Sequence, residues 1–534
     1  MKKRSRYLTV LTACVLVGIV TALFCSAGGQ QAASPAAGSG KTKVSWAIWP
    51  AHVTNDDNEL KTRIEEKFPK IDINFIYLDR ANYLQLLNTR IAGGDVPDII
   101  YCETNARVAL LARQGVVMEL PYDTVKKNAP ITYNATIPYG KEVWMAGMVD
   151  GKNYALPIMQ PDMIASRSNY WRKDYLDKLG VTKVPETLNE AAAVFEQVRK
   201  TDLRGTGKND VYGVTYRGKD YPSNLFQNVF AAYGVMVERW MIQKDGTVVA
   251  AFLDDRCAGA LATLNEWYKK GYIDPEFPVD DNATVLQKIG AGATAYVEVG
   301  GWSRIQPPNG QHISAAKAVN PKAEFVISPP LKGPNGDSGY VQFGSISSSL
   351  AFSKALEKDP AKLAFALQFL DFINADTPEA IYIRYGVEGK DYERNPDTGA
   401  TFNAHKTPDA IAKAGAFVIE AARPIPSVSI KFYTRKDDPQ YNLYARAGTV
   451  QPEISYPTWI GFFADSSITS LGGELDIMLH KGLIDIITGA RPLADYDKIR
   501  QEWYKAGGDK ITAEMNRAYK QGRPYYDAVI NAIK

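Results

Sequence analysis

Cysteine is scarce in this chain of 534 residues, which contains only four. Two of them, Cys14 and Cys25, lie in or beside an apolar run at the N-terminus, so the rest of the chain keeps Cys102 and Cys257. Two cysteines so far apart in a large chain are more often separate buried thiols than a disulfide, which is the alternative. The fold must therefore depend on its apolar cores, because no disulfide framework is present.

Catalytic and metal-binding signatures are also absent. The sequence has no H-E-x-x-H, C-x-x-C, G-x-x-x-x-G-K or G-x-S-x-G motif, and its four histidines lack metal-ligand spacing. The letters GDSG at residues 336–339 resemble the nucleophile loop of trypsin-like proteases, but the Pro- and Gly-rich stretch PPLKGPNGDSGY predicts turns there. A glycosidase needs only two neighbouring carboxylates, so the 59 acidic residues leave that class open.

A strong charge of one sign is missing as well. The formal net charge is +3, 23% of the residues are charged, and no basic stripe is present, so nucleic acid is not an expected partner. Tyrosine and tryptophan, with 30 and 9 copies, exceed what a core of this size needs. Because these side chains combine an apolar body with a polar tip, their number indicates a surface that binds a ligand.

The N-terminus has the layout of a secretory signal. Basic residues within positions 2–6 precede an apolar run over residues 7–24. The run has a borderline length for crossing a bilayer, so an uncleaved anchor is the alternative. Residues 26–40, SAGGQQAASPAAGSG, contain no large apolar side chains and predict a flexible tether. We therefore expect a signal peptide over residues 1–24 and a tether over 25–40, followed by the globular body.

Strand and helix patterns alternate at the start of this body. Apolar runs and alternation predict strands over residues 44–49, 71–77 and 98–101, and apolar residues at every fourth position predict helices over 60–68 and 83–91. This order is typical of an α/β fold with parallel crossovers, whose ligands bind at the carboxyl ends of the strands.

Residues that directly follow the predicted strands are therefore candidates for a ligand cleft. They are Trp49 and His52 after the first strand and Glu103 after the third. Further on, Asp359 and Pro360 predict the start of a strong helix, and the tail beyond residue 467 is mostly helical in pattern. The mixture of α/β units and long helical stretches favours two lobes with more than one crossing between them.

The segment DLRGTGKND over residues 202–210 has a pattern similar to that of an EF-hand calcium loop. Asp202, Thr206 and Asp210 place oxygen atoms at its first, fifth and ninth positions, and Gly207 stands at the sixth. Arg204 departs from the pattern, because the third position should offer an oxygen and a guanidinium places a positive charge where the ion would be. One interpretation is a calcium site, and the other is a tight turn in which Arg204 stands in for the cation.

Several short segments are each a weak indication of a protein family, but their order along the chain is a specific one. They are AGGDVPDII (92–100), DGKNYALP (150–157), YWRKDYLDKLG (170–180) followed by VPETLNE, KTDLRGTGKNDVYGVT (200–215), PPLKGPNG (329–336), YGVEGKDY (385–392), and IITG (486–489) followed by WYKAGGDKI. In these segments the chain resembles family 1 extracellular solute-binding proteins, in the large lipoprotein branch that includes the alginate-binding proteins. The resemblance covers nearly the whole mature chain.

The resemblance implies an α/β fold of the two-lobed periplasmic-binding-protein type (type II), with an interlobe cleft and extra C-terminal helices. The first part of lobe 1 would cover residues 41–160, and the first part of lobe 2 would cover residues 161–330. Residues 331–534 would contain the returning segments of both lobes and the C-terminal helices. It further implies a monomer that captures its ligand by hinge closure, delivers it to the permease of an ABC importer and catalyses no reaction. Cys25, directly after the apolar run, is the candidate for lipidation, although Ala22, Leu23 and Phe24 before it depart from the usual recognition sequence.

Carbohydrate is the expected ligand, because pyranose C–H faces pack on aromatic rings and sugar hydroxyls need planar polar partners. Trp302 and Trp459 lack helical periodicity and follow Gly or a Pro-containing stretch, so they are candidates for the cleft, and Trp240 and Arg304 come next. Tryptophans 46, 171 and 267 stand in strand or helix patterns and are expected in the cores. A secreted polysaccharide lyase or glycosidase and a binding protein for peptides or metal chelates are the two alternatives.

Overall fold

The computed structural model describes residues 41–49, 57–79, 82–137, 141–158, 169–219, 225–237, 240–298, 304–305, 310–339, 348–394, 401–405, 407–416, 418–419 and 458–533. The chain divides into two compact units, Met1–Lys41 and Thr42–Lys534. Everything below concerns the second unit. The expected signal peptide, the tether, Cys25, His52 and Trp302 lie outside the described residues.

The first lobe is built on a five-stranded sheet in the order β2-β1-β3-β13-β6. Strands β1, β2 and β3 are parallel, whereas β13 runs antiparallel to both of its neighbours. Their bounds are β1 Thr42–Ile48, β2 Ile71–Tyr77, β3 Ile99–Cys102, β6 Ala155–Ile158 and β13 Ser348–Phe352. The three strands expected from the apolar patterns are confirmed to within two residues.

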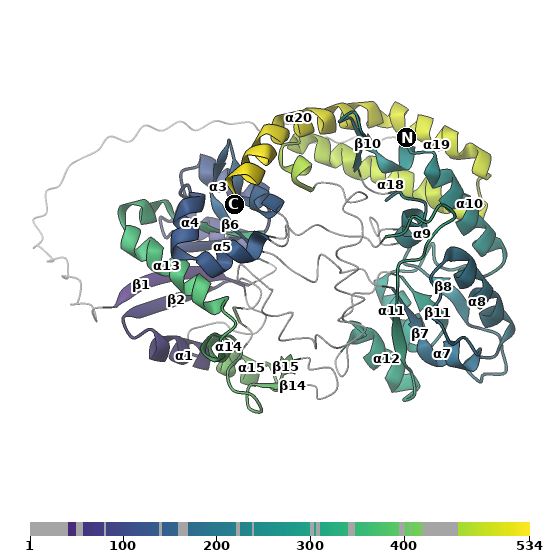
Figure 1. Cartoon of the computed structure of the whole chain (residues 1–534), viewed down its shortest axis with the longest axis horizontal. Helices are drawn as coiled ribbons and strands as arrows, with labels where there is room; N and C mark the ends of the chain where they lie inside the picture. Colours follow the sequence, from purple (N-terminus) through teal and green to yellow (C-terminus); the bar gives the residue numbers. More distant parts are fainter. Residues whose placement is uncertain are drawn as a thin grey trace, which may run out of the picture. The chain divides into compact units, whose positions relative to one another are not determined.

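Helices α1 to α5, α13, α14 and α15 accompany this sheet (Figure 1). Asp359 caps α13 by accepting a hydrogen bond from the Lys362 amide at 3.0 Å, and Pro360 begins the helix, as expected. The bounds are α1 Glu59–Lys67, α2 Tyr83–Ala92, α3 Asn105–Arg113, α4 Tyr122–Asn128, α5 Pro130–Thr136, α13 Pro360–Ile373, α14 Pro378–Tyr385 and α15 Pro408–Ala414. The short helix η2 (Lys141–Gly147) and the pair β4 (Met148–Val149) and β5 (Lys152–Asn153) lead into β6.

The second lobe contains a four-stranded sheet in the order β12-β7-β11-β8. Strands β8 and β11 are parallel, and β7 runs antiparallel to both β11 and β12. The bounds are β7 Asn169–Arg172, β8 Tyr212–Thr215, β11 Thr294–Val297 and β12 Phe325–Ser328. The chain thus leaves the first sheet after β6, builds the second, and returns to the first through β13, which gives the two expected lobes.

The helices of the second lobe surround a separate apolar core. Trp171 and Trp267 lie in this core, and Trp46 lies in the core of the first lobe, as expected for all three. The helix bounds are α7 Lys173–Lys178, α8 Leu188–Lys200, α9 Gln227–Ala231, α10 Arg256–Lys269, α11 Asn282–Gly290 and α12 Gln311–Val319. Leu331 also packs in this core, so the second lobe extends slightly beyond residue 330.

The C-terminal helices contribute to both cores. Leu483 of α18 (Ser466–Thr488) and Trp503 of α19 (Tyr496–Trp503) pack in the second core, whereas Val529 of α20 (Asp509–Ala532) packs in the first. The hairpin of β9 (Trp240–Ile242) and β10 (Val248–Ala250) contacts α20. The helical tail predicted beyond residue 467 is therefore confirmed, and it connects the lobes in addition to the strand crossings.

Two sequence expectations have a clear outcome here. Cys102 and Cys257 are both free and buried, which confirms two separate thiols. Gly336 has a left-handed backbone with φ of 84°, and its amide donates to the Gly333 carbonyl at 3.1 Å, which confirms the turn in the GDSG segment. Within the described ranges, no helix combines the length and apolarity needed to cross a membrane.

Candidate ligand-binding site

The second sheet brings polar residues to one of its edges. Because β7 runs antiparallel to β11 and β12, the start of β7 meets the ends of its two neighbours, and β8 ends at the same edge. Thr215 ends β8, Glu298 follows β11 and Asn169 begins β7. The carboxyl edge of parallel strands is where α/β proteins bind their ligands.

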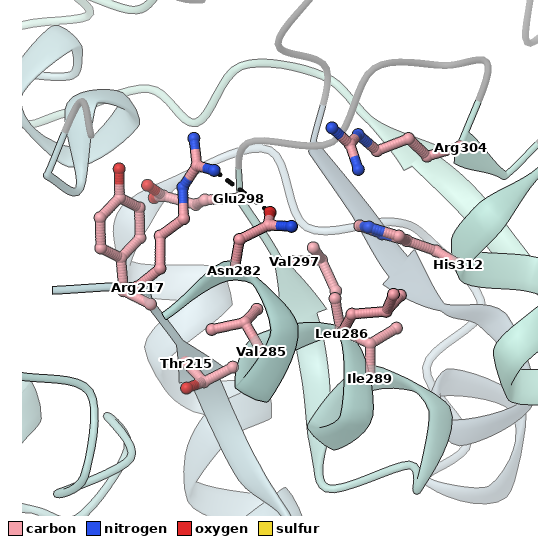
Figure 2. A pocket seen from close by; sticks show the side chains of 11 residues that line it. Thr215, Arg217, Asn282, Val285, Leu286, Ile289, Val297, Glu298, Arg304 and His312 are labelled. Atoms are coloured by element: carbon pink, nitrogen blue, oxygen red, sulfur yellow. Dashed lines mark hydrogen bonds between the residues drawn. The ribbon is translucent and has the colours of Figure 1, made fainter. Parts of the chain in front are cut away.

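A pocket of about 390 Å³ lies at this edge (Figure 2). Its apolar part comprises three side chains of α11, Val285, Leu286 and Ile289, together with Val297 of β11. The other lining residues carry polar groups: Thr215, Tyr216, Arg217, Asn282, Glu298, Arg304 and His312. The pocket thus has an apolar floor with polar groups around it.

Two arginines stand on the polar side of the pocket, above the apolar residues in Figure 2. Arg217 Nη1 donates to Asn282 Oδ1 at 3.2 Å, and Arg304 Nη1 donates to Gln311 Oε1 at 2.7 Å. Both acceptors are uncharged amides. These two bonds orient the guanidinium groups.

Glu298 is the most deeply buried carboxyl of the pocket. It is 6% exposed, and its Oε2 atom has no hydrogen-bond partner among the described residues. Burial raises the pKa of Glu298 to about 8, although hydrogen bonds from the side chain and backbone of Asn228 act in the opposite direction. At neutral pH the carboxyl is therefore mostly protonated and can donate a hydrogen bond.

His312 completes the polar lining at the start of α12. Its Nδ1 atom hydrogen-bonds to the hydroxyl of Tyr170, which lies in β7. Burial, with a smaller contribution from the charge of Arg304, lowers the pKa of His312 to about 3. The imidazole is therefore neutral at pH 7, and the arginines provide the charge of the lining.

An ionic cluster of Lys288 with three carboxylates fixes α11. Lys288 Nζ contacts Asp274 Oδ2 at 2.7 Å, Glu276 Oε2 at 2.9 Å and Asp280 Oδ2 at 2.6 Å. Burial acts to lower the pKa of Lys288, but its hydrogen bonds to the three carboxylates outweigh burial and raise that pKa. Thr215 Oγ1 donates to Asp274 Oδ2 at 3.0 Å, so the cluster also anchors the end of β8.

The corresponding edge of the first sheet carries Trp49 and Glu103, as expected from the sequence. Trp49 follows β1 and meets Tyr101 of β3 edge-on, with ring centroids 5.2 Å apart. The Tyr83 hydroxyl donates to the Tyr101 carbonyl at 3.0 Å and supports this edge from α2. Partial burial raises the pKa of Glu103, which follows β3, above its usual value. Both candidates are half-buried, so each presents part of its surface at this edge.

Trp459 does not lie at a ligand surface, contrary to our expectation. It is 2% exposed and stacks on Tyr526 and Tyr519 of α20, with ring centroids 5.3 and 5.8 Å away. The short helix η7 (Thr458–Phe462) contacts α20, so the preceding proline-containing stretch leads into a packed core. Trp240 is half-buried in β9 and packs against both cores, and it is not among the residues that line the pocket.

The loop over residues 202–210 is closed by its own side chains. Arg204 Nη1 lies 2.9 Å from Asp210 Oδ2, to which Thr206 Oγ1 also donates at 3.3 Å. Asp202 accepts hydrogen bonds from the Thr206 and Gly207 amides, at 3.0 and 2.7 Å. A guanidinium thus pairs with the carboxylate that a calcium ion would need, so these donors do not fit the ion as they stand.

Sequence reasoning missed most of the polar pocket residues, with Arg304 as the exception. Glu298 directly follows the apolar strand TAYV, and Arg217 stands two residues after the strand YGVT. The rule that selected Trp49 and Glu103, applied to these later strands, would have found both. Asn282 and His312 lie in the first turns of helices, and no local pattern distinguishes them from other helix starts.

Comparison with known proteins identifies relatives of the whole chain. Residues 49–379 match the family model described as bacterial extracellular solute-binding protein. The polygalacturonan/rhamnogalacturonan-binding protein YtcQ of Bacillus subtilis (strain 168) is 23% identical, over 98% of this chain and 100% of its own length. Lipoprotein LipO of the same organism is 24% identical, over 92% of this chain and 95% of its own.

The fold recurs in solved structures. The ABC-transporter substrate-binding protein FusA of S. pneumoniae, in complex with kestose, superposes with a TM-score of 0.61 at 16% identity. That superposition covers 90% of this chain and 99% of FusA. At this identity the likeness establishes the two-lobed fold and not the ligand.

Proposed function

Because the chain belongs to the family of bacterial extracellular solute-binding proteins, we propose that it captures an oligosaccharide and delivers it to the permease of an ABC importer. The observation that carries this proposal is the pocket at the strand ends of the second lobe, in which an apolar floor meets amide, guanidinium and carboxyl groups. Such a surface suits a sugar, whose C–H faces pack on apolar groups while its hydroxyls accept and donate hydrogen bonds. The polysaccharide and kestose ligands named for YtcQ and FusA support the same class.

We propose that capture proceeds by hinge closure of a monomer. The chain crosses between the sheets after β6 and again before β13, and two sheets joined in this way are an arrangement that can close around a ligand by hinge motion. A ligand that touches both lobes binds the closed form better and shifts the population by that difference in affinity. Trp49 and Glu103 of the first lobe would then meet the ligand opposite the pocket.

The proposed role involves no chemical reaction on the sugar. The matching family and the two relatives are named as binding proteins or lipoproteins, not as enzymes. Incubation of the purified protein with candidate oligosaccharides should therefore yield no new reducing or unsaturated ends. New ends would establish the lyase or glycosidase alternative.

We further propose a lipid anchor on Cys25 after removal of the signal peptide. The support is its position directly after the apolar run and the description of LipO as a lipoprotein. Replacement of Cys25 by Ser should move the protein from the membrane to the soluble fraction. A variant that stays in the membrane would point to the uncleaved helix instead.

Calcium is not needed in this proposal. The pairing of Arg204 with Asp210 supports a loop that keeps its conformation without the ion. Of the ranges that the structure describes, none gathers three or more His, Cys, Asp or Glu side chains in a metal-binding arrangement.

Thermal shifts with a ligand panel test the ligand class. Because a ligand that binds only the folded form stabilises it by mass action, an oligosaccharide at about 100 times its Kd should add about 2.7 kcal/mol to the free energy of unfolding. The panel contains neutral and acidic oligosaccharides, peptides and metal chelates. A melting temperature that rises with peptides or chelates and not with any sugar would replace carbohydrate by that class.

A further inference from the structure

His312 stands between a buried tyrosine and the pocket of the second lobe. Its ring lines the pocket (Figure 2), and its Nδ1 atom shares a hydrogen bond with the hydroxyl of Tyr170 in β7. We propose that His312 presents an uncharged Nε2–H group to an oxygen atom of the ligand, and that Tyr170 is the positioning residue that fixes this tautomer. The ligand contact rests on the proposed function, whereas the tautomer is a property of the protein alone.

The Tyr170 hydroxyl is the donor of the hydrogen bond. Tyr170 is fully buried, and His312 is its one hydrogen-bond partner among the described residues. Burial raises the pKa of the hydroxyl, so it keeps its proton. If the hydroxyl accepted a hydrogen bond from Nδ1 instead, its own proton would be buried without an acceptor, which is unfavourable. The proton therefore points to Nδ1, which must carry a lone pair.

The position of the second proton follows from this direction. A neutral imidazole has one N–H group and one acceptor nitrogen, so a ring that accepts at Nδ1 carries its proton on Nε2. The ring stays neutral because burial, and to a smaller extent the charge of Arg304, disfavours a second proton and lowers the pKa of His312 to about 3. Between pH 5 and pH 8 the ring thus holds a single proton, and Nε2 carries it.

Packing holds both rings in place. The rings of Tyr170 and His312 meet at 65° with centroids 5.7 Å apart, and Tyr170 meets Phe325 of β12 nearly edge-on at 5.5 Å. His312 is itself 6% exposed, so its ring has little room to turn. A donor that is already oriented loses little conformational freedom when a ligand binds, which favours affinity.

An uncharged N–H donor selects an oxygen atom that can accept. A hydroxyl or ether oxygen of a sugar fits this requirement, whereas an ammonium group or an amide N–H of a ligand would place a donor against a donor. The guanidinium of Arg304 in the same pocket is also a donor, but it carries a charge. His312 therefore adds a contact that depends on the position of an oxygen atom and not on its charge.

Nitrogen-15 spectroscopy of the full chain tests the tautomer. Protonated and unprotonated ring nitrogens resonate in separate regions, and the chain has only four histidines, so a comparison with His312→Gln assigns the signals. We expect one proton, on Nε2 of His312, at every pH from 5 to 8. A proton on Nδ1, or a ring that gains a second proton within this range, overturns the proposal.

Tyr170→Phe tests the positioning role, because it removes the hydroxyl and keeps the ring. Without the donor to Nδ1, both tautomers of His312 should become populated. Tyr175→Phe is the matched control, since it removes a hydroxyl of the same lobe that donates to the Gly292 carbonyl at 2.8 Å. The control should keep the proton on Nε2. A single Nε2–H tautomer in Tyr170→Phe would show that Tyr170 does not fix the ring.

Calorimetric titration tests the ligand contact, with kestose and a galacturonate trisaccharide as probes. For a probe that raises the melting temperature of the natural chain, His312→Leu should weaken binding about 2- to 10-fold, the range for one uncharged hydrogen bond. His312→Gln keeps an N–H donor and should lose less. An unchanged affinity of His312→Leu overturns the ligand contact and leaves the proposed function intact. If no sugar binds, the proposed function and the ligand contact fail together, and the spectra still decide the tautomer.

Discussion

The two sheets present similar edges with different chemistry. In the first lobe, the residues after β1 and β3 are Trp49 and Glu103, an aromatic ring and a single carboxyl group. In the second lobe, Glu298 follows β11 and is accompanied by Arg217 and Arg304. Topology places both edges where a ligand can bind, but the individual side chains decide what each can recognise. The first edge carries an aromatic ring and a carboxyl group, and the second carries guanidinium, amide and carboxyl groups.

The two edges are also supported differently. Aromatic contacts between Trp49, Tyr101 and Tyr83 stabilise the first edge. The second depends on Lys288 and its carboxylate partners, which join α11 to the end of β8. Buried charges are costly to leave unpaired, whereas aromatic contacts are lost gradually, so the two edges should respond differently to mutation.

Lys288→Met should produce the largest effect. It leaves Asp274 and Asp280, whose side chains are 3% and 4% exposed, without their cation, and should lower the free energy of unfolding by about 3–5 kcal/mol. Urea denaturation measures the loss. Lys270→Met, which breaks an exposed pair with Glu266, is the control and should cost less than about 0.5 kcal/mol. Equal losses in both variants would show that the second edge does not depend on its buried ions.

Glu298 should give the second lobe a pH dependence. An unfolded glutamate ionises near pH 4.5, whereas the folded carboxyl keeps its proton up to about pH 8. Between these values only the folded state binds the proton, so stability falls as pH rises, by at most about 1.4 kcal/mol per pH unit. We expect a loss of about 3 kcal/mol between pH 5 and pH 8, measured by urea denaturation at each pH.

Neutral variants at the two edges isolate this effect. Glu298→Gln should flatten the pH dependence, because the carboxyl is replaced by an uncharged group of similar shape. The pKa of Glu103 is also raised by burial, but this side chain is half-buried, so Glu103→Gln should change the slope less. A larger change for Glu103→Gln would show that the edge of the first sheet, and not that of the second, contributes most of the pH dependence.

Trp49→Ala tests the aromatic edge. Loss of a stacking ring should weaken the binding of an oligosaccharide that stabilises the natural chain by about 10-fold, because the ring would no longer pack on a sugar face. Trp49→Phe should restore most of the affinity. Calorimetric titration with that oligosaccharide checks the expectation, and an unchanged affinity of the Trp49→Ala variant would show that the ring at the first edge does not contact the ligand.

Much of the fold could be predicted from the sequence, because local patterns determine it. The strand 71–77 alternates apolar and polar residues, and Asp359 and Pro360 mark a helix start that the structure confirms. The position of β13 could not be predicted, since Ser348–Phe352 is buried throughout and shows no period, and its neighbours β3 and β6 lie far away in the chain.

The candidate site was predictable only in part. Arg304 was ranked below Trp459 and lines the pocket, whereas Trp459, selected because it lacks helical periodicity and follows a Pro-containing stretch, is covered by Tyr519 and Tyr526. Sequence identifies a turn but not the helix, distant in the chain, that packs on it. The state of Glu298 depends on burial by several elements, which no local pattern contains.

The smallest expected effect concerns the calcium-like loop, where the sequence left two alternatives, a calcium site and a turn in which Arg204 stands in for the cation, and the structure pairs Arg204 with Asp210. Arg204→Ala should cost no more than about 1 kcal/mol, because the pair with Asp210 is partly exposed. Arg204→Asp supplies the missing oxygen at the third position, and Asp210 Oδ1, which has no partner in the described part of the chain, becomes available as a ligand. We expect calcium to raise the melting temperature of Arg204→Asp and not that of the natural chain, compared with a chelator. Asp202→Asn added to Arg204→Asp should abolish the response, and a natural chain that gains several degrees with calcium would show that the guanidinium does not replace the ion.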